Sequence, residues 1–130
     1  MLGTAINKLI NKLIVAYVGD KQITSPYFIR PGMTVYLVTC VHHYRYCEAA
    51  YLLSKPEKRY DVGPFVDFRT KGDYRSSFSL RDYNVIPSGY NNHAAFFTEK
   101  GAKEYLAKFP LCDGFVPPKY NWHDDFDDIF

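Results

Sequence analysis

A chain of 130 residues is long enough for one domain with a buried core, and 47% hydrophobic and 23% charged residues are typical of a folded globular protein. The formal charge of +2 is too small to indicate nucleic-acid binding by itself. The three cysteines, Cys40, Cys47 and Cys112, have no framework spacing, which argues against a disulfide-stapled secreted fold and favours a cytoplasmic location. The apolar run from Leu13 to Val18 is too short to span a bilayer, so we expect no membrane partner.

The first predicted element is a helix over residues 3–17. Apolar side chains recur there at steps of three and four residues, while asparagine and lysine occupy the other face. The apolar set is Ile6, Leu9, Ile10, Leu13, Ile14 and Tyr17. We expect this apolar face to cover a sheet, and a helix lying on a membrane surface is the alternative.

Strands and turns fill the middle of the chain. Residues 34–41 are rich in β-branched and aromatic side chains and predict a strand. Residues 44–53 suit either a short helix or a second strand. The remaining pattern predicts a turn at 55–58, strands near 60–68, 77–80 and 94–97, polar loop sequence at 70–75 and an irregular loop at 83–92.

The last predicted helix begins after Thr98, which is expected to cap it, and continues to about Lys108. Gly101 is expected to weaken this helix by about 1 kcal/mol relative to Ala. The order of elements predicts an α+β fold: a small curled antiparallel sheet, or half-barrel, flanked by an N-terminal and a C-terminal helix. Residues 1–120 are expected to form a single domain, followed by an acidic aromatic tail at 121–130.

The tail carries a formal charge of −4 and the rest of the chain +6. On a helix its aromatic residues would form one apolar stripe, with the aspartates mostly outside it. Segments of this kind dock into a groove of a basic partner. The alternatives are that the tail folds back onto the domain or only increases solubility. The predicted partner-binding residues are Trp122, Asp124, Asp125, Phe126, Asp127, Asp128 and Phe130, with Ile129 as an alternative third apolar position.

The central region offers a second binding hypothesis, because basic residues alternate with aromatic ones. Aromatic rings stack on bases and basic side chains contact phosphates. Six acidic residues over 44–82 leave a net charge of only +2 there, so a solvated mixed-charge surface explains the pattern equally well. The candidate nucleic-acid-binding residues are Arg45, Lys58, Arg59, Arg69, Lys71 and Arg75.

The cluster Cys40, His42, His43 and Cys47 has side chains that can ligate a metal. On a strand Cys40 and His42 share one face and His43 faces away, which leaves at most three ligands. A structural zinc site needs four, and a buried free Cys beside surface histidines is the competing interpretation. We therefore predict no metal and no cofactor.

Catalysis has no assembled candidate either. Ser88 with His93 is the nearest approach to a nucleophile and base, on an irregular loop. The clustered aspartates lie on a tail, where they cannot be held within the tolerance that metal catalysis needs. We predict no catalytic residues and a protein that is not an enzyme.

Two stretches resemble a known group of proteins. They are Arg30-Pro-Gly-Met-Thr-Val-Tyr-Leu-Val and, farther along, Ala95-Phe-Phe-Thr-Glu-Lys-Gly-Ala-Lys-Glu-Tyr-Leu. Over roughly residues 30–109 they resemble the opening strand and closing strand–helix motifs of small accessory proteins of bacteriophages and prophages. The closing motif is a core strand, a cap and an apolar helix face, so it reports fold and not chemistry.

The resemblance implies a phage-type accessory protein, a group whose members act on host machinery, including as inhibitors of restriction or CRISPR effectors. We expect a cytoplasmic interaction protein that occludes a basic surface of a host target, with an anti-CRISPR as the specific version. A nucleic-acid-binding module is the alternative.

Overall fold

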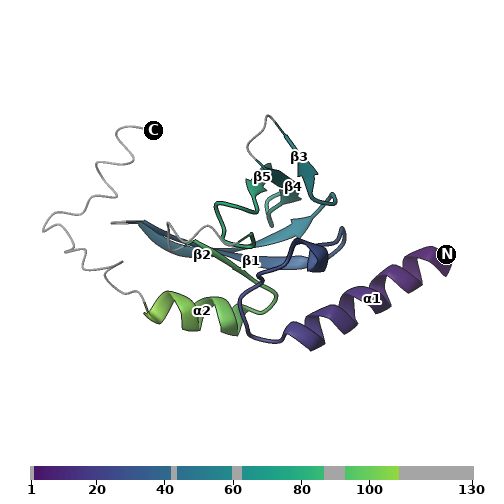
Figure 1. Ribbon diagram of the computed structural model, residues 1–130, viewed down its shortest axis with the longest axis horizontal. Coiled ribbons are helices and arrows are strands. Elements are labelled where there is room, and N and C mark those ends of the chain that lie inside the picture. The colour runs from purple at the N-terminus through teal and green to yellow at the C-terminus, as the bar shows by residue number, and fades with distance from the viewer. Residues whose placement is uncertain (1, 42–43, 60–62, 87–92, 109–130) are drawn as a thin grey trace, which may run out of the picture.

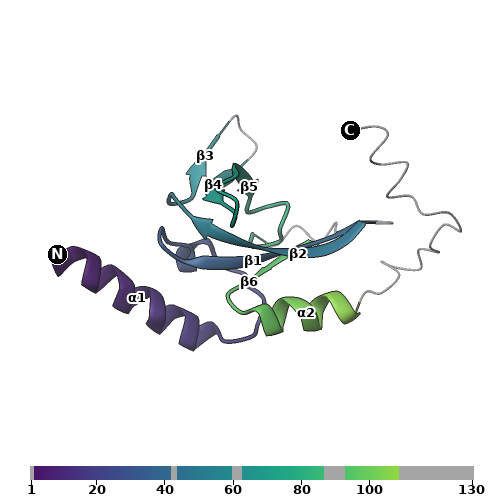
Figure 2. The ribbon, with the colours of Figure 1, turned by 180° about the vertical axis from the view of Figure 1, so that it is seen from behind.

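The computed structural model describes residues 2–41, 44–59, 63–86 and 93–108. Within these ranges two α-helices and a curled sheet make up most of the fold, and Figures 1 and 2 show them from opposite sides. In chain order the elements are α1 (Leu2–Val18), the short 3-10 helix η1 (Pro26–Phe28), β1 (Thr34–Val41), β2 (Tyr44–Leu52), β3 (Glu57–Lys58), β4 (Pro64–Arg69), β5 (Arg75–Ser79), β6 (Ala94–Phe96) and α2 (Glu99–Lys108).

The sheet is antiparallel throughout, with the strand order β3-β4-β2-β1-β6 and with β5 paired to β4. Its longest pairing joins β1 to β2, from Thr34 opposite Tyr51 to Val41 opposite Tyr44. Strands β3, β4 and β5 bend away from the plane of β1 and β2 (Figure 1). The predicted α+β class is confirmed, and so is the half-barrel between two helices.

The ambiguous segment 44–53 is a strand. Its side chains alternate, with Ala50 and Leu52 buried and Tyr51 exposed between them, because successive side chains of a strand point to opposite faces. Antiparallel pairing with β1 along the segment provides hydrogen-bond partners for its backbone amide and carbonyl groups. The predicted turn at 55–58 was wrong in part, because Glu57 and Lys58 pair with β4 as the short strand β3.

Each face of the sheet contributes to a separate apolar cluster. The larger cluster lies inside the curl of the half-barrel, around Val35, Leu37 and Leu52. The smaller one lies under α2, where Val38, Phe96 and Ala102 meet. The two clusters explain why β1 is apolar on both faces and why its sequence does not alternate.

Helix α2 begins at the predicted cap, since the Thr98 hydroxyl accepts a hydrogen bond from the Gly101 amide over 3.0 Å. Gly101 is buried against the turn that follows α1. A Cβ at this position would overlap the carbonyl oxygen of Asp20 and lie 3.0 Å from Cδ1 of Phe96. The glycine therefore permits a close backbone approach, and the expectation that it only weakens the helix was incomplete.

One cysteine differs from the expectation of free thiols. Cys40 is disulfide-bonded, whereas Cys47 is free. The remaining cysteine, Cys112, lies outside the described residues.

Candidate functional site

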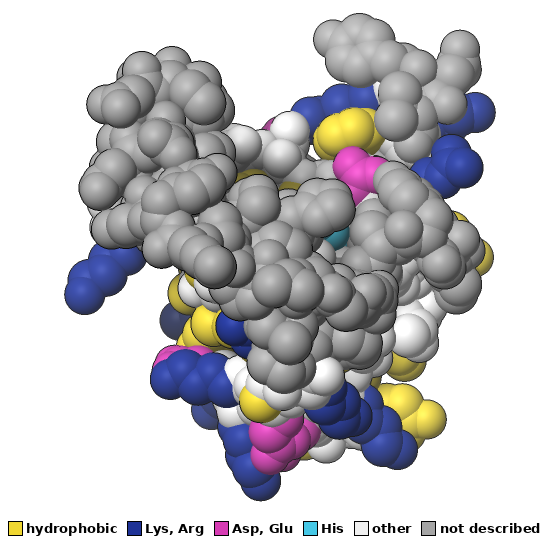
Figure 3. All heavy atoms as spheres, turned by 90° about the vertical axis from the view of Figure 1, so that its left-hand side faces the viewer, with side chains coloured by type: hydrophobic (Ala, Val, Ile, Leu, Met, Phe, Trp, Pro, Cys, Tyr) yellow, Lys and Arg dark blue, Asp and Glu magenta, His cyan; other side chains and the backbone are white. Residues whose placement is uncertain are grey.

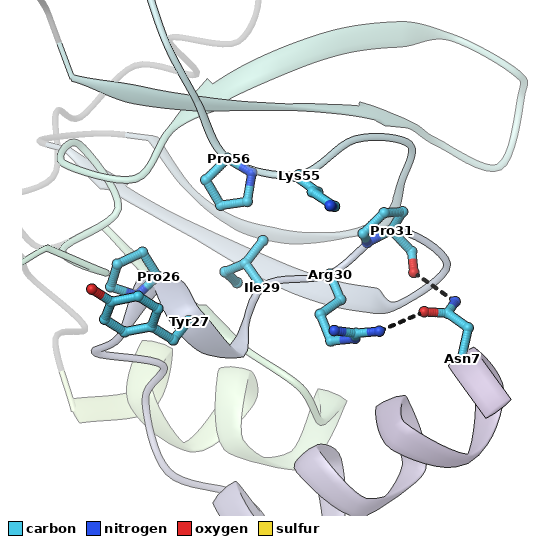
Figure 4. A pocket seen from close by; sticks show the side chains of 8 residues that line it. All are labelled: Asn7, Pro26, Tyr27, Ile29, Arg30, Pro31, Lys55 and Pro56. Carbon is cyan, nitrogen blue, oxygen red and sulfur yellow. Dashed lines mark hydrogen bonds between the residues drawn. The ribbon is translucent and has the colours of Figure 1, made fainter. Parts of the chain in front are cut away.

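Two asparagines, one helical turn apart, hold α1 against the segment that precedes β1. Both side-chain amides donate to the carbonyl oxygen of Pro31, Asn7 over 3.3 Å and Asn11 over 3.1 Å. Both amide oxygens accept from Arg30, whose Nη2 lies 2.9 Å from Asn7 and whose Nε lies 3.1 Å from Asn11. Asn7, Asn11, Arg30 and Pro31 form what we call the amide clamp, part of which is drawn in Figure 4.

The clamp leaves little room for the residue after it. Gly32 has φ of 85°, in the left-handed region. A Cβ there would lie 3.4 Å from Nδ2 of Asn7 and 3.5 Å from Nδ2 of Asn11. Gly32 therefore serves both the turn and the close approach of the two amides.

The sequence reasoning missed the clamp, although one signal for it was present. The tetrapeptide Asn-Lys-Leu-Ile occurs at 7–10 and again at 11–14. A four-residue repeat places equivalent side chains on the same side of a helix, one turn apart. The duplication therefore explains why two amides reach the same carbonyl group.

Helix α1 leaves most of its predicted apolar face uncovered, which corrects the expectation from the sequence, and Ile14 of that set packs against the large core. The exposed fractions are 47% for Ile6, 57% for Leu9, 61% for Leu13 and 81% for Tyr17. These four residues are called the apolar face of α1 below. The clamp places the asparagines on the side of α1 that faces the protein. The helix therefore contacts the large core only near its C-terminal end, through side chains that include Val18.

The central basic region forms a row across three strands. Tyr51 on β2 pairs with Arg69 on β4, and Arg69 pairs with Arg75 on β5. The guanidinium carbon of Arg69 lies 4.6 Å from the centroid of the Tyr51 ring, a cation–π contact. Tyr74 is 67% exposed beside Arg75 at the end of the β4–β5 hairpin. The described structure thus brings an exposed tyrosine and two arginines together.

The other predicted basic residues lie in different settings. Arg45 donates from Nη2 to the Leu106 carbonyl oxygen over 2.7 Å, near the C-terminal end of α2, where a positive charge is favourable. Arg59 forms ion pairs with Asp67 and Glu57, and hydrogen bonding to Asp67 raises the pKa of its guanidinium. Lys58 on β3 and Lys71 in the β4–β5 turn are exposed.

Charge of both signs is distributed over the side of the molecule seen in Figure 3. Lys and Arg side chains project from its edges with acidic side chains beside them. Arg59 illustrates this arrangement, because both of its carboxylate partners are themselves partly exposed. An acidic side chain also lies beside the row of Tyr51, Arg69 and Arg75, because Nε of Arg75 is 4.0 Å from Oδ1 of Asp73.

The predicted chemical sites are only partly covered by the described residues. His42, His43 and Ser88 lie outside them, as do residues 121–130 of the tail. His93 packs edge-on against the Tyr83 ring with centroids 5.4 Å apart, and burial lowers the pKa of its imidazole. Within the described ranges no group of three His, Cys, Asp or Glu side chains could hold a metal ion.

These features define a small α+β protein with exposed contact surfaces on a folded body. A search of protein families matches residues 23–109 to the phage g100-like protein family. The chain belongs to this family, and the resemblance to phage proteins is confirmed at that level. No curated protein and no solved structure matches the chain. None of the helices in the described part of the chain is long and apolar enough to cross a membrane.

The boundaries of the family match divide the amide clamp. Arg30 and Pro31 lie inside the matched segment, whereas Asn7 and Asn11 precede it. The helix that orients Arg30 is therefore supplied by a part of the chain outside the match.

Proposed function

We propose that this phage-family protein acts by binding a macromolecule of the bacterial host and blocking its function by occlusion. The observation that carries the proposal is the apolar face of α1. Ile6, Leu9, Leu13 and Tyr17 follow one another at helical steps and stay exposed on a helix that the fold holds by other contacts. Contiguous exposed apolar side chains of this kind are typical of interaction sites.

The acidic aromatic tail supplies the second part of the proposal. Its charge of −4 would complement a basic, nucleic-acid-facing groove on the target. Such electrostatic attraction raises the rate of association and weakens with added salt. A CRISPR effector is the first target to test, since such effectors expose basic channels that bind nucleic acid.

The test compares full-length protein with three variants in a pull-down from host lysate, followed by an activity assay of the captured target. The variants are deletion of residues 121–130, the pair Leu9→Gln with Leu13→Gln, and Lys103→Ala as a control on exposed α2 surface. We expect the tail deletion to fold and to lose binding, the α1 pair to bind at least about tenfold more weakly, and the control to behave like the parent protein.

The outcomes separate the two contact regions. Full capture and full inhibition by the tail-deleted protein would remove the tail from the proposal. Unchanged binding by the α1 pair would remove the helix. If both variants inhibit as well as the parent protein, occlusion by these surfaces is wrong.

Nucleic-acid binding is a second candidate, and the row of Tyr51, Arg69 and Arg75 favours it. It predicts a mobility shift with single-stranded DNA at about 50 mM salt that falls steeply as salt rises. Substituting Arg69→Gln with Arg75→Gln should weaken the shift about tenfold, whereas Lys8→Gln on α1 should leave it unchanged. Absence of a shift with folded protein would exclude this candidate.

A further inference from the structure

A pocket of about 450 Å³ opens between α1, η1 and the segment that joins β2 to β3. Figure 4 shows Arg30 at its centre and Lys55 above it. Its volume is in the range of small-molecule and side-chain binding pockets. Among the described residues, its lining includes Arg30 and Lys55 but no acidic residue. The pocket is therefore cationic in a molecule that is otherwise of mixed charge.

The amide clamp orients the guanidinium of Arg30 without neutralising it. Nε and Nη2 donate to the amide oxygens of Asn11 and Asn7, which carry no formal charge. Among the described residues, Nη1 of Arg30 makes no hydrogen bond. The end-on fork formed by Nη1 and the second hydrogen of Nη2 can therefore donate to both oxygens of an oxyanion.

The rest of the pocket is apolar. Pro26, Ile29 and Pro56 form its walls, and the ring of Tyr27 stands at one side with 89% of the residue exposed. Figure 4 shows these side chains grouped on the opposite side of Arg30 from Asn7. A ligand that fits both parts combines an oxyanion with an apolar body.

Two cations fit a single oxyanion better than a nucleic-acid backbone. A strand of nucleic acid presents regularly repeated phosphates, and its binding sites combine a continuous basic groove with aromatic rings on which bases stack. Here the described residues that line the pocket include one tyrosine, three prolines and the two cations Arg30 and Lys55. A carboxylate can accept both hydrogen bonds of the Arg30 fork with a single negative charge, and an apolar side chain next to it would contact the apolar walls.

We propose that this pocket binds an acidic segment of a partner polypeptide, in which an aspartate or glutamate is adjacent to an apolar residue. The carboxylate would lie on the Arg30 fork and near Lys55, and its neighbour against Ile29 and the prolines. This inference rests on the proposed role as a binding protein and adds the chemistry of a partner segment.

The test titrates the blocked peptide acetyl-Phe-Asp-Asp-Phe-amide into full-length purified protein. NMR spectra monitor the chemical shifts of the protein's backbone amides. The matched control peptide is acetyl-Phe-Asn-Asn-Phe-amide, and inorganic phosphate is titrated separately. Protein variants are Lys55→Gln, Arg30→Lys and, as a control on α2 outside the pocket, Lys103→Gln. A fourth variant combines Asp124→Asn, Asp125→Asn, Asp127→Asn and Asp128→Asn, which removes the acidic groups of the protein's own tail.

We expect the acidic peptide to change the amide chemical shifts of residues around Ile29. The parent protein should bind the Asn peptide about tenfold more weakly than the acidic one, and Arg30→Lys should weaken binding of the acidic peptide by a similar factor. Lys55→Gln should weaken it less. Lys55 is exposed and outside the clamp, so its substitution keeps the test valid if Arg30→Lys unfolds the protein. Lys103→Gln should bind like the parent protein.

Several results would overturn the proposal. The first is that the acidic peptide does not bind at about 50 mM salt. The second is that both peptides bind equally well, and the third is that neither Arg30→Lys nor Lys55→Gln changes the affinity. Phosphate that binds as tightly and displaces the peptide would make this a site for a bare oxyanion. Peptide binding seen only in the Asn-substituted protein would assign the pocket to the chain's own tail. Because no host protein is present, failure here leaves the lysate experiment unaffected.

Discussion

The two helices are attached to the body of the protein by different interactions. Helix α2 packs apolar side chains against Val38 and Phe96, and Gly101 lets its backbone approach the turn after α1. Helix α1 is attached through the two asparagines of the amide clamp and touches the large core only near its C-terminal end. Both helices are amphipathic in sequence, yet α1 leaves Ile6, Leu9, Leu13 and Tyr17 exposed. An apolar stripe therefore shows where a helix can bind, not what it binds.

The largest difference between the two helices is expected when alanine replaces one glycine in each of them. Gly101→Ala should lower the free energy of unfolding by about 2 kcal/mol, because overlap with the Asp20 carbonyl outweighs the gain of about 1 kcal/mol in helix propensity. Gly3→Ala should not destabilise, since nothing lies within 4 Å of the added Cβ. Urea unfolding of the two proteins measures both changes. Equal effects of the same sign would refute the close approach at Gly101.

A loss of intermediate size is expected at the clamp. Asn11 is 8% exposed and makes two hydrogen bonds, one to Pro31 and one from Arg30. Asn11→Ala should therefore cost about 1–2 kcal/mol in the free energy of unfolding and increase amide hydrogen exchange in α1. Lys12→Ala, at the exposed neighbouring position, is the matched control. A variant as stable as this control would show that the amides do not hold the helix.

The smallest effect on stability is expected on the apolar face of α1. Leu9→Gln should change the free energy of unfolding by less than about 0.5 kcal/mol, because Leu9 is 57% exposed and glutamine is a good helix former. The same change in α2, Leu106→Gln, should cost about 1–2 kcal/mol, since Leu106 packs against the smaller core cluster. Thermal unfolding compares the two. A large loss at Leu9 would mean that this face supports the fold after all.

Much of the architecture followed from local pattern. The strand at 34–41 matches β1, and the cap at Thr98 is made as predicted. Helix α1 extends the predicted 3–17 by one residue at each end. These elements are readable because β-branched runs, capping side chains and helical periodicity act within a few residues of the chain. Whether 44–53 was helix or strand could not be read locally, because its identity depends on a ladder with β1.

The candidate sites were less predictable. Tyr51 precedes Arg69 and Arg75 by a whole strand and two turns, and it becomes their neighbour through strand register, which no local pattern reports. Arg45 and Arg59 look alike in sequence to Arg69, yet one caps α2 and the other pairs with two carboxylates. Charge type was visible in the sequence, whereas the partner of each charge depended on the fold.

By itself the sequence determined the class of fold, most of its elements and the kinship with phage proteins, since these rest on short-range periodicity and local motifs. Only the tertiary structure decided which side of α1 faces the protein. The hydrophobic effect favours burying the leucines, but the carbonyl oxygen of Pro31 and the guanidinium of Arg30 offer hydrogen bonds that only Asn7 and Asn11 can complete. The apolar face of α1 remains exposed because the polar contacts lie on its other side.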